Sequence, residues 1–137
     1  MNHHRIISLV VAFAIGIFLA LYSFERISDP EPALQRAREE AVVLSAREIL
    51  KAYVSPSVEI EIVDPLSTDR VVGKSYIYPV ENGWEVSGHY RRYATDRWHP
   101  FLMSLDTNVK LLSLTVRDDD AKIAVAARDN AKFSVSE

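Results

Sequence analysis

Two histidines and one glutamate near the middle of the chain carry side chains of the kind that bind metal ions. His89 and His99 fall on two expected strands joined by a short loop, an arrangement that would let them lie opposite one another. Glu85 falls on the same strand face as His89, so the three side chains suggest a zinc site with three ligands. Two histidines without a tighter motif are explained more simply as exposed strand residues, so we predict no metal site and no cofactor.

Paired carboxylates are a second arrangement that supports catalysis in other proteins. Glu59 and Glu61 alternate along one expected strand, which places their carboxylates about 7 Å apart, a spacing that glycoside hydrolysis uses. The same alternation is typical of the solvated face of a strand, which is the interpretation we favour. Ser87 lies inside an expected strand and not at a strand-to-helix turn, so it lacks the setting of a nucleophile. We therefore expect no catalytic residue and no enzymatic activity.

The segment 91–99 is rich in the side chains that dominate protein interfaces. The residues predicted to bind a partner are Arg91, Arg92, Tyr93, Arg97, Trp98 and His99. Arginine and aromatic side chains act as binding hot spots through planar hydrogen bonds, stacking and large rigid contact areas. In a mildly acidic chain, such a surface suits a protein partner with a carboxylate, a phospholipid head group or an acidic glycan.

A structural interpretation of the same segment stays open beside the binding one. Tyr93 and Trp98 would then pack across a hairpin between two strands. The arginines would stack on these rings, or pair with Asp96 and Glu85. If the segment binds a partner instead, Arg91, Arg97 and Trp98 are expected to project into solvent.

A long helix is expected to precede these residues. Ser28-Asp29-Pro30 carries the signals of a helix start and Ser55-Pro56 those of a helix end, so Ala33 to Val54 is predicted to be helical. One apolar stripe along this helix is formed by Val42, Ala46, Ile49 and Tyr53. A second stripe, offset from the first, is formed by Leu34, Ala37, Ala41 and Leu44. The two stripes indicate a helix that bends or meets two surfaces.

After Pro56 the hydrophobic period changes from that of a helix to that of strands. The expected strands cover residues 58–62, 70–80, 84–93, 98–105 and 109–116. Asn82-Gly83 signals a hairpin turn, and Trp84 is expected to face the helix and belong to the core. The acidic, alanine-rich tail 118–137 is predicted to contain a short helix within 121–132, although Ile123, Val125 and Ala127 alternate as in a strand. The expected fold class is α+β, with one long helix on an antiparallel meander of four to five strands, in a domain over 33–117.

The uncharged run Ile6–Phe24 precedes this domain. As one continuous helix it would be about 28 Å long, close to the ~30 Å of a bilayer core, so the run predicts a single-pass transmembrane anchor. A cleaved signal peptide is the alternative interpretation of the same run. Residues 1–5 would stay in the cytoplasm, and a short linker over 25–32 would lead to a domain outside the inner membrane. Ala12, Gly16 and Ala20 form a ladder of small residues that predicts helix–helix packing in the membrane, and so a homodimer.

Composition narrows the choice of function. The chain holds 16 Lys and Arg against 19 Asp and Glu, with a formal charge of −3, which argues against a nucleic-acid partner. We expect a membrane-anchored, non-enzymatic interaction domain or an accessory subunit of an envelope complex. One alternative is a module that binds a small ligand or lipid in a cleft lined by Tyr76, Tyr78, Trp84 and Tyr90. Another is a hydrolase, which would need a buried pair of titratable groups that the sequence does not reveal.

Overall fold

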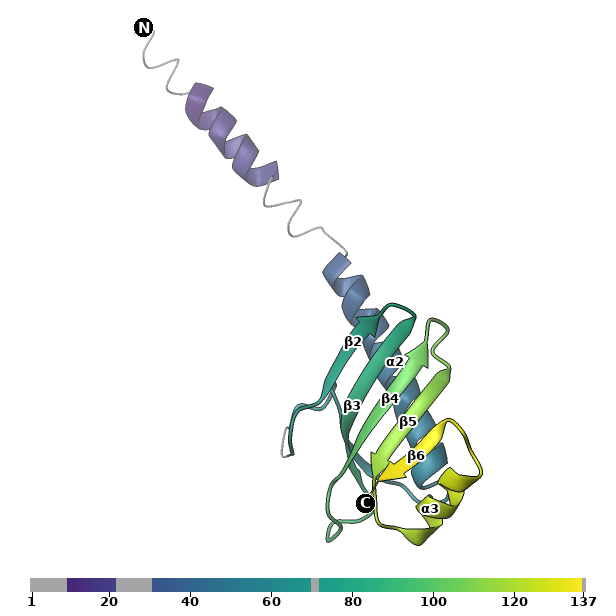
Figure 1. Cartoon of the computed structure of the whole chain (residues 1–137). Coiled ribbons are helices and arrows are strands. Elements are labelled where there is room, and N and C mark those ends of the chain that lie inside the picture. Colours follow the sequence, from purple (N-terminus) through teal and green to yellow (C-terminus); the bar gives the residue numbers. More distant parts are fainter. Residues whose placement is uncertain (1–9, 22–30, 70–71, 137) are drawn as a thin grey trace, which may run out of the picture. The chain divides into compact units, whose positions relative to one another are not determined.

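The computed structural model of the chain describes residues 10–21, 31–69 and 72–136 (Figure 1). The chain forms two compact units, Met1–Arg36 and Ala37–Glu137. After a helix over residues 10–21, the elements are α2 (Glu31–Val54), β1 (Glu61–Val63), β2 (Tyr76–Val80), β3 (Gly83–Arg91), β4 (His99–Asp106), β5 (Leu111–Arg117), α3 (Ala121–Arg128) and β6 (Phe133–Ser136). The class is therefore α+β, as predicted from the change of hydrophobic period.

The prediction of an N-terminal transmembrane helix is wrong. Within the apolar run, residues 10–21 are described by the structure and are helical. Across the described ranges, no helix combines the length and the hydropathy of a membrane span. The predictions of single-pass topology, of an inner-membrane location and of a domain outside that membrane depended on this anchor and fail with it.

The structure does not test the other predictions about the N-terminal segment. The ends of the apolar run, the segment 1–5 and most of the linker 25–32 lie outside the described residues. Ala12, Gly16 and Ala20 lie on the helix over 10–21, and a Cβ placed on Gly16 would meet no atom within 4 Å. Their packing against a second copy stays a prediction.

The six strands form one mixed sheet with the order β1-β3-β4-β5-β6. β1 pairs with the end of β3 and β2 with its beginning, so both lie along the same edge of β3. All pairings are antiparallel except β5 with β6, because α3 crosses between these two strands and makes them parallel. The predicted antiparallel meander therefore ends at β5, and the tail adds both a helix and a sixth strand.

The hairpin predicted at Asn82-Gly83 is confirmed. Val80 of β2 pairs with Gly83 of β3, so the chain reverses within two residues. Gly83 has a φ of 152°, and a Cβ there would lie 1.9 Å from the carbonyl oxygen of Leu105 on the neighbouring strand. Only glycine fits this position, because both the backbone conformation and the close approach of β4 exclude a side chain.

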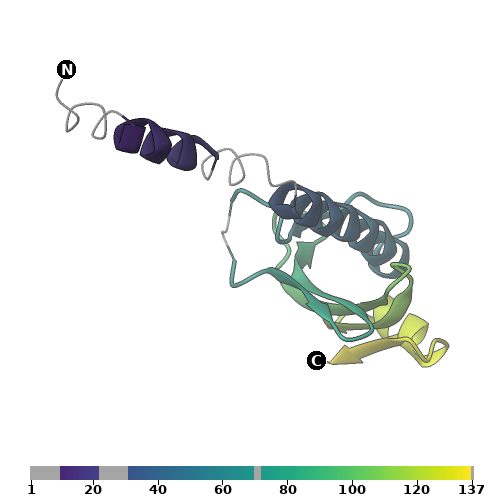
Figure 2. The same ribbon diagram turned by 90° about the horizontal axis from the view of Figure 1, so that it is seen from above.

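The core lies between α2 and the sheet that curves beside it (Figure 2). Its buried members are Val42, Val43, Ala46, Leu50, Val54, Val86, Tyr90, Phe101, Met103, Leu105, Leu114, Val116, Ile123 and Phe133. The stripe predicted from Val42 is therefore confirmed, although Ile49 and Tyr53 are only partly buried. The second stripe, including Leu44, is exposed. Trp84 packs against the core at its margin and is half buried.

Candidate functional site

The segment predicted to bind a partner joins β3 to β4 as a hairpin loop over residues 92–98. The structure divides its six predicted residues into three pairs. Arg92 and His99 point inward, and their side chains are 16% and 2% exposed. Arg91 and Trp98 are half buried and stack on one another. Tyr93 and Arg97 are exposed. We call Arg91, Tyr93, Arg97 and Trp98 the hairpin surface.

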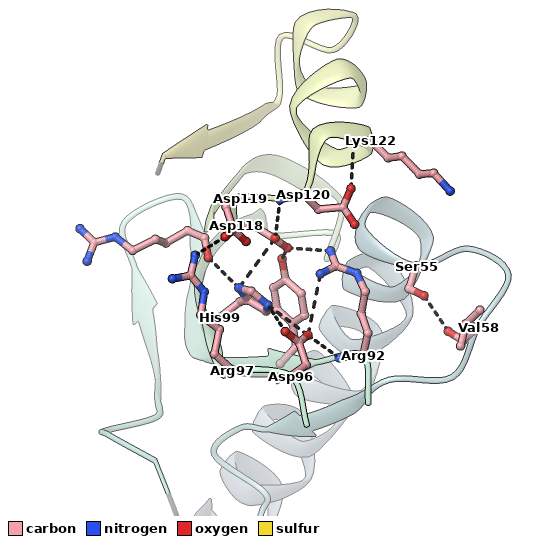
Figure 3. A network of polar contacts seen from close by, with 12 residues as sticks. Ser55, Val58, Arg92, Asp96, Arg97, His99, Asp118, Asp119, Asp120 and Lys122 are labelled. Atoms are coloured by element: carbon pink, nitrogen blue, oxygen red, sulfur yellow. Dashed lines mark hydrogen bonds and ion pairs between the residues drawn. The ribbon is translucent and has the colours of Figure 1, made fainter. Parts of the chain in front are cut away.

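Polar contacts join side chains of the hairpin loop to the segment after β5 in a buried charge cluster (Figure 3). This buried charge cluster consists of Tyr90, Arg92, Asp96, His99 and Asp118. Register explains how it forms: Tyr90 of β3 pairs with His99 of β4, and Phe101 of β4 pairs with Val116 of β5. These two pairings bring the start of β4 beside the end of β5, where Asp118 follows.

Asp118 is the most heavily bonded member of the cluster. Its carboxylate accepts hydrogen bonds from the Tyr90 hydroxyl at 2.5 Å and from Nη2 of Arg92 at 2.6 Å. It also accepts one from the backbone N–H of Asp120 at 3.1 Å. Burial acts to raise the pKa of Asp118, but the bonds from Arg92 and Tyr90 outweigh it and hold that pKa below its usual value. The buried carboxylate is therefore kept ionised.

Asp96 closes the hairpin loop from within. Its carboxylate accepts hydrogen bonds from the backbone N–H of Arg92 at 3.1 Å and from Nε2 of His99 at 3.1 Å. Its own backbone N–H donates to the carbonyl of Tyr93 at 2.9 Å, which forms a turn. Burial acts to raise the pKa of Asp96, but these donors prevail and lower it. The loop that carries the hairpin surface is thus held by internal bonds.

Acid should weaken the fold through these two carboxylates. Because the pKa values of Asp96 and Asp118 are lower in the folded chain, their stabilising contribution is complete above the unfolded value of ~3.9 and is lost as pH falls through the folded values. Urea unfolding of the full chain between pH 7 and about pH 2 should show this loss, and Asp118→Asn should make it less steep. The exposed neighbour provides the control: Asp119→Asn should retain the wild-type slope. An unchanged slope for Asp118→Asn would contradict the assignment.

The buried charge cluster contains a close pair of titratable groups, His99 and Asp96, of the kind that a hydrolase would need. The sequence did not reveal this pair. Its geometry does not favour catalysis, because both ring nitrogens of His99 face protein oxygens. Nδ1 lies 3.2 Å from the carbonyl oxygen of Arg117, and Nε2 contacts Asp96. A general base must reach the proton that it abstracts, and this imidazole has no nitrogen left for a substrate.

Arg91 and Trp98 form a shelf on the outer side of the loop. The guanidinium of Arg91 lies 4.4 Å from the ring centre of Trp98, a cation–π contact. The same group pairs with Glu61 of β1 at 2.7 Å and donates to the carbonyl of Ala94 at 3.1 Å. The shelf lines an open groove of about 530 Å³ beside β1, with Leu66 on the opposite loop. Arg91 and Trp98 are therefore less solvent-exposed than the binding interpretation predicted.

The three-ligand zinc arrangement does not form. His99 shares the core face of the sheet with Tyr90, whereas His89, one residue earlier on β3, lies on the opposite face with Glu85. Nδ1 of His89 is buried without a hydrogen-bond partner, and burial lowers the pKa of this histidine. Within the described ranges, no group of three potential metal ligands comes together.

The other predicted groups are also separated. Glu59 pairs with Lys51 of α2 at 3.1 Å, while Glu61 pairs with Arg91, so each carboxylate has its own basic partner. Tyr76 and Tyr78 stack on one another at 5.2 Å on the outer face of the sheet. Tyr90 is fully buried on the inner face, so the aromatic residues predicted to line a ligand cleft do not share one.

Comparison with known proteins found no matching family model, no matching curated protein and no matching solved structure.

Proposed function

We propose that this protein is a non-enzymatic interaction domain that binds a protein partner through the hairpin surface. The observation that carries the proposal is the shelf of Arg91 and Trp98, which lines an open groove, together with the exposed Tyr93 and Arg97 of the same hairpin. Tyrosine, tryptophan and arginine are the residues enriched at binding hot spots. Arg91 at the end of β3 and the three others on the loop provide a contact area of this chemistry.

The buried charge cluster supports the proposal because it holds the loop in one shape. Asp96 ties the loop closed, and Arg92 connects it to Asp118 beyond β5. A surface that is already ordered loses less conformational entropy when it binds, so more of its contact energy appears as affinity. Arg92 and His99 are two of the six residues predicted to bind a partner. In this proposal they hold the loop in shape and do not contact the partner themselves.

The charges around the loop indicate what the partner presents. Arg97 reaches solvent and pairs with Asp119 at 3.2 Å, both side chains being largely exposed. An exposed pair of this kind contributes little to stability, so its guanidinium is available to a carboxylate on another protein. A protein partner that presents an acidic group therefore fits Arg97.

A pair of exposed substitutions should test this proposal without disturbing the fold. Chemical crosslinking of the full chain in its native extract, followed by mass spectrometry, would identify the partner for titration in purified form. Tyr93→Ala combined with Arg97→Ala should then weaken binding at least about 30-fold, since even one hot-spot residue contributes ~2 kcal/mol or more. Both residues are exposed, so circular dichroism and urea unfolding should match those of the wild type.

The matched control replaces the same residue types elsewhere. Tyr78 lies exposed on the outer face of the sheet and Arg38 lies exposed on α2. Tyr78→Ala combined with Arg38→Ala should leave affinity within about twofold of the wild type. If this control loses binding and the hairpin variant retains it, the contact surface lies on the outer face of the sheet or on α2, and the proposal is wrong.

A further inference from the structure

One edge of the sheet ends in β6, beyond which the described part of the chain places no further strand. β6 is last in the strand order β1-β3-β4-β5-β6 and lies next to β5 and α3 (Figure 1). The carbonyl of Lys132 accepts the N–H of Leu114 at 2.7 Å, and the carbonyl of Ser136 accepts that of Asp118 at 3.0 Å. Successive residues of a strand turn their backbone groups in opposite directions, so the N–H and carbonyl of Val135 point away from β5. This edge therefore offers backbone groups that a further strand can bond.

The edge formed by β2 is protected against such pairing, whereas β6 is not. The N–H of Tyr76 in β2 points toward β3, where it donates to the Ser87 hydroxyl at 3.3 Å, so by alternation Ile77 and Pro79 face the open side. Pro79 has no N–H to donate, and a proline of this kind is one way in which proteins block an edge strand. The strand Phe133–Ser136 contains neither proline nor a charged residue. Its edge therefore lacks these two common barriers to pairing.

A groove of about 370 Å³ lies between α3 and β6. Its apolar lining comes from Ala124 and Ala127 of α3 and from Phe133 and Val135 of β6. Val135 pairs with the buried Val116, so the two side chains share the inner face of the sheet. Side chains directly opposite one another in an antiparallel pair are close neighbours on one face. A strand that pairs with β6 at Val135 would therefore place a side chain beside this apolar groove.

The two ends of the groove carry opposite charges. Arg128, which lines the groove, is the last residue of α3 and is joined to the start of β6 by residues 129–132. Asp119 and Asp120 also line the groove and lie beside the end of β6, because the N–H of the preceding residue bonds the carbonyl of Ser136. An antiparallel second copy of β6 reverses this order, so the basic end of each copy meets the acidic end of the other. A contact with two-fold symmetry needs a self-complementary surface of this kind.

We propose that β6 pairs in antiparallel orientation with β6 of a second copy of this chain, which joins the two sheets into one. The two-fold axis passes beside Val135, whose N–H and carbonyl exchange hydrogen bonds with those of Val135 in the second copy. The two valine side chains lie together at the apolar grooves. Arg128 of each copy lies toward Asp119 and Asp120 of the other. This self-association does not depend on whether the hairpin surface binds a partner.

Amide exchange of the full chain at increasing concentration tests the pairing directly. Exchange at the N–H of Val135 should be about tenfold slower at ~500 µM than at ~5 µM, because this group becomes bonded only in the pair. The N–H of Ser134 points toward β5 in both states and serves as the internal reference. Sedimentation equilibrium over the same range should show one copy becoming two. A chain that stays single, or a dimer without slower exchange at Val135, would overturn the proposal.

Proline substitutions on the two edges provide a matched pair of variants. Val135→Pro removes the N–H at the centre of the proposed contact and should abolish the dimer. Ile77→Pro removes the corresponding outward N–H from β2, so it should dimerise as the wild type does. Circular dichroism checks that both variants fold. Equal dimerisation of the two folded variants would refute pairing through β6.

Charge reversal tests the orientation of the two copies without altering the backbone. Arg128→Glu and Asp119→Lys should each weaken self-association about tenfold or more, because each brings like charges together at both ends of the contact. An equal mixture of the two variants should restore association, since the mixed pair has opposite charges at both ends. A mixture that associates no better than either variant alone would contradict the antiparallel arrangement, even if Val135→Pro did not fold.

Discussion

Replacing Arg92 with alanine should lower the free energy of unfolding by about 3–5 kcal/mol, a large part of the ~5–15 kcal/mol that stabilises a small domain. Arg92 bonds Asp118 at 2.6 Å and lies 4.0 Å from Asp96. Its removal leaves the buried carboxylate of Asp118 without its guanidinium partner and takes the positive charge of this contact from Asp96. Removing one partner of a buried ion pair is costly because the other charge stays desolvated. Urea unfolding of the full chain, followed by circular dichroism, measures the change.

Arg97 provides a control on the same loop. It too pairs with an aspartate just beyond β5, but this pair is exposed, with 60% and 69% of the two side chains reaching solvent. Arg97→Ala should therefore change the free energy of unfolding by only ~0–1 kcal/mol. Equal effects of the two substitutions would mean that the buried charge cluster is no more stabilising than a surface ion pair.

Truncating Leu50 should be comparably destabilising for a different reason. Leu50 of α2 is fully buried among the core residues of the sheet. Leu50→Ala removes apolar contacts and leaves a cavity, which together cost about 2–5 kcal/mol. The midpoint of urea unfolding should move to a clearly lower concentration of denaturant, with near-native circular dichroism in its absence.

The matched control lies on the other side of the same helix. Leu44 is 47% exposed and belongs to the apolar stripe that does not face the sheet. Leu44→Ala should change the free energy of unfolding by less than about 0.5 kcal/mol, as is usual for surface positions. A loss at Leu44 as large as that at Leu50 would show that this stripe is also packed against a surface of the protein.

Local patterns predicted much of the fold. The period of apolar residues located α2 and its buried stripe from Val42, because a helix must turn one face toward the sheet. Alternation and the Asn-Gly signal located β2 and β3 with the correct turn between them. The tail was harder to predict: β6 has only four residues, too few for alternation to distinguish a strand from the end of a helix. Hydropathy alone also predicted a membrane span, which no helix of the described residues provides.

The buried charge cluster was not predictable from local patterns. Asp118 stands in a run of three aspartates, and any of them suits a helix cap or a solvated turn. In the structure Asp120 caps α3, Asp119 pairs with Arg97 at the surface and Asp118 turns into the protein. No spacing in the chain distinguishes these roles, because Arg92 and Asp118 are 26 residues apart and meet only through strand pairing.

By itself the sequence determined the α+β class, the long helix, the hairpin at Gly83 and the concentration of arginine and aromatic residues in segment 91–99. These features follow from periodicity, turn chemistry and composition, which act over a few neighbouring residues. Only the tertiary structure decided which residues of that segment face inward. The register of β3, β4 and β5 placed His99 and Arg92 beside Asp118 and left Tyr93 and Arg97 in solvent, because burial depends on what the rest of the chain brings alongside.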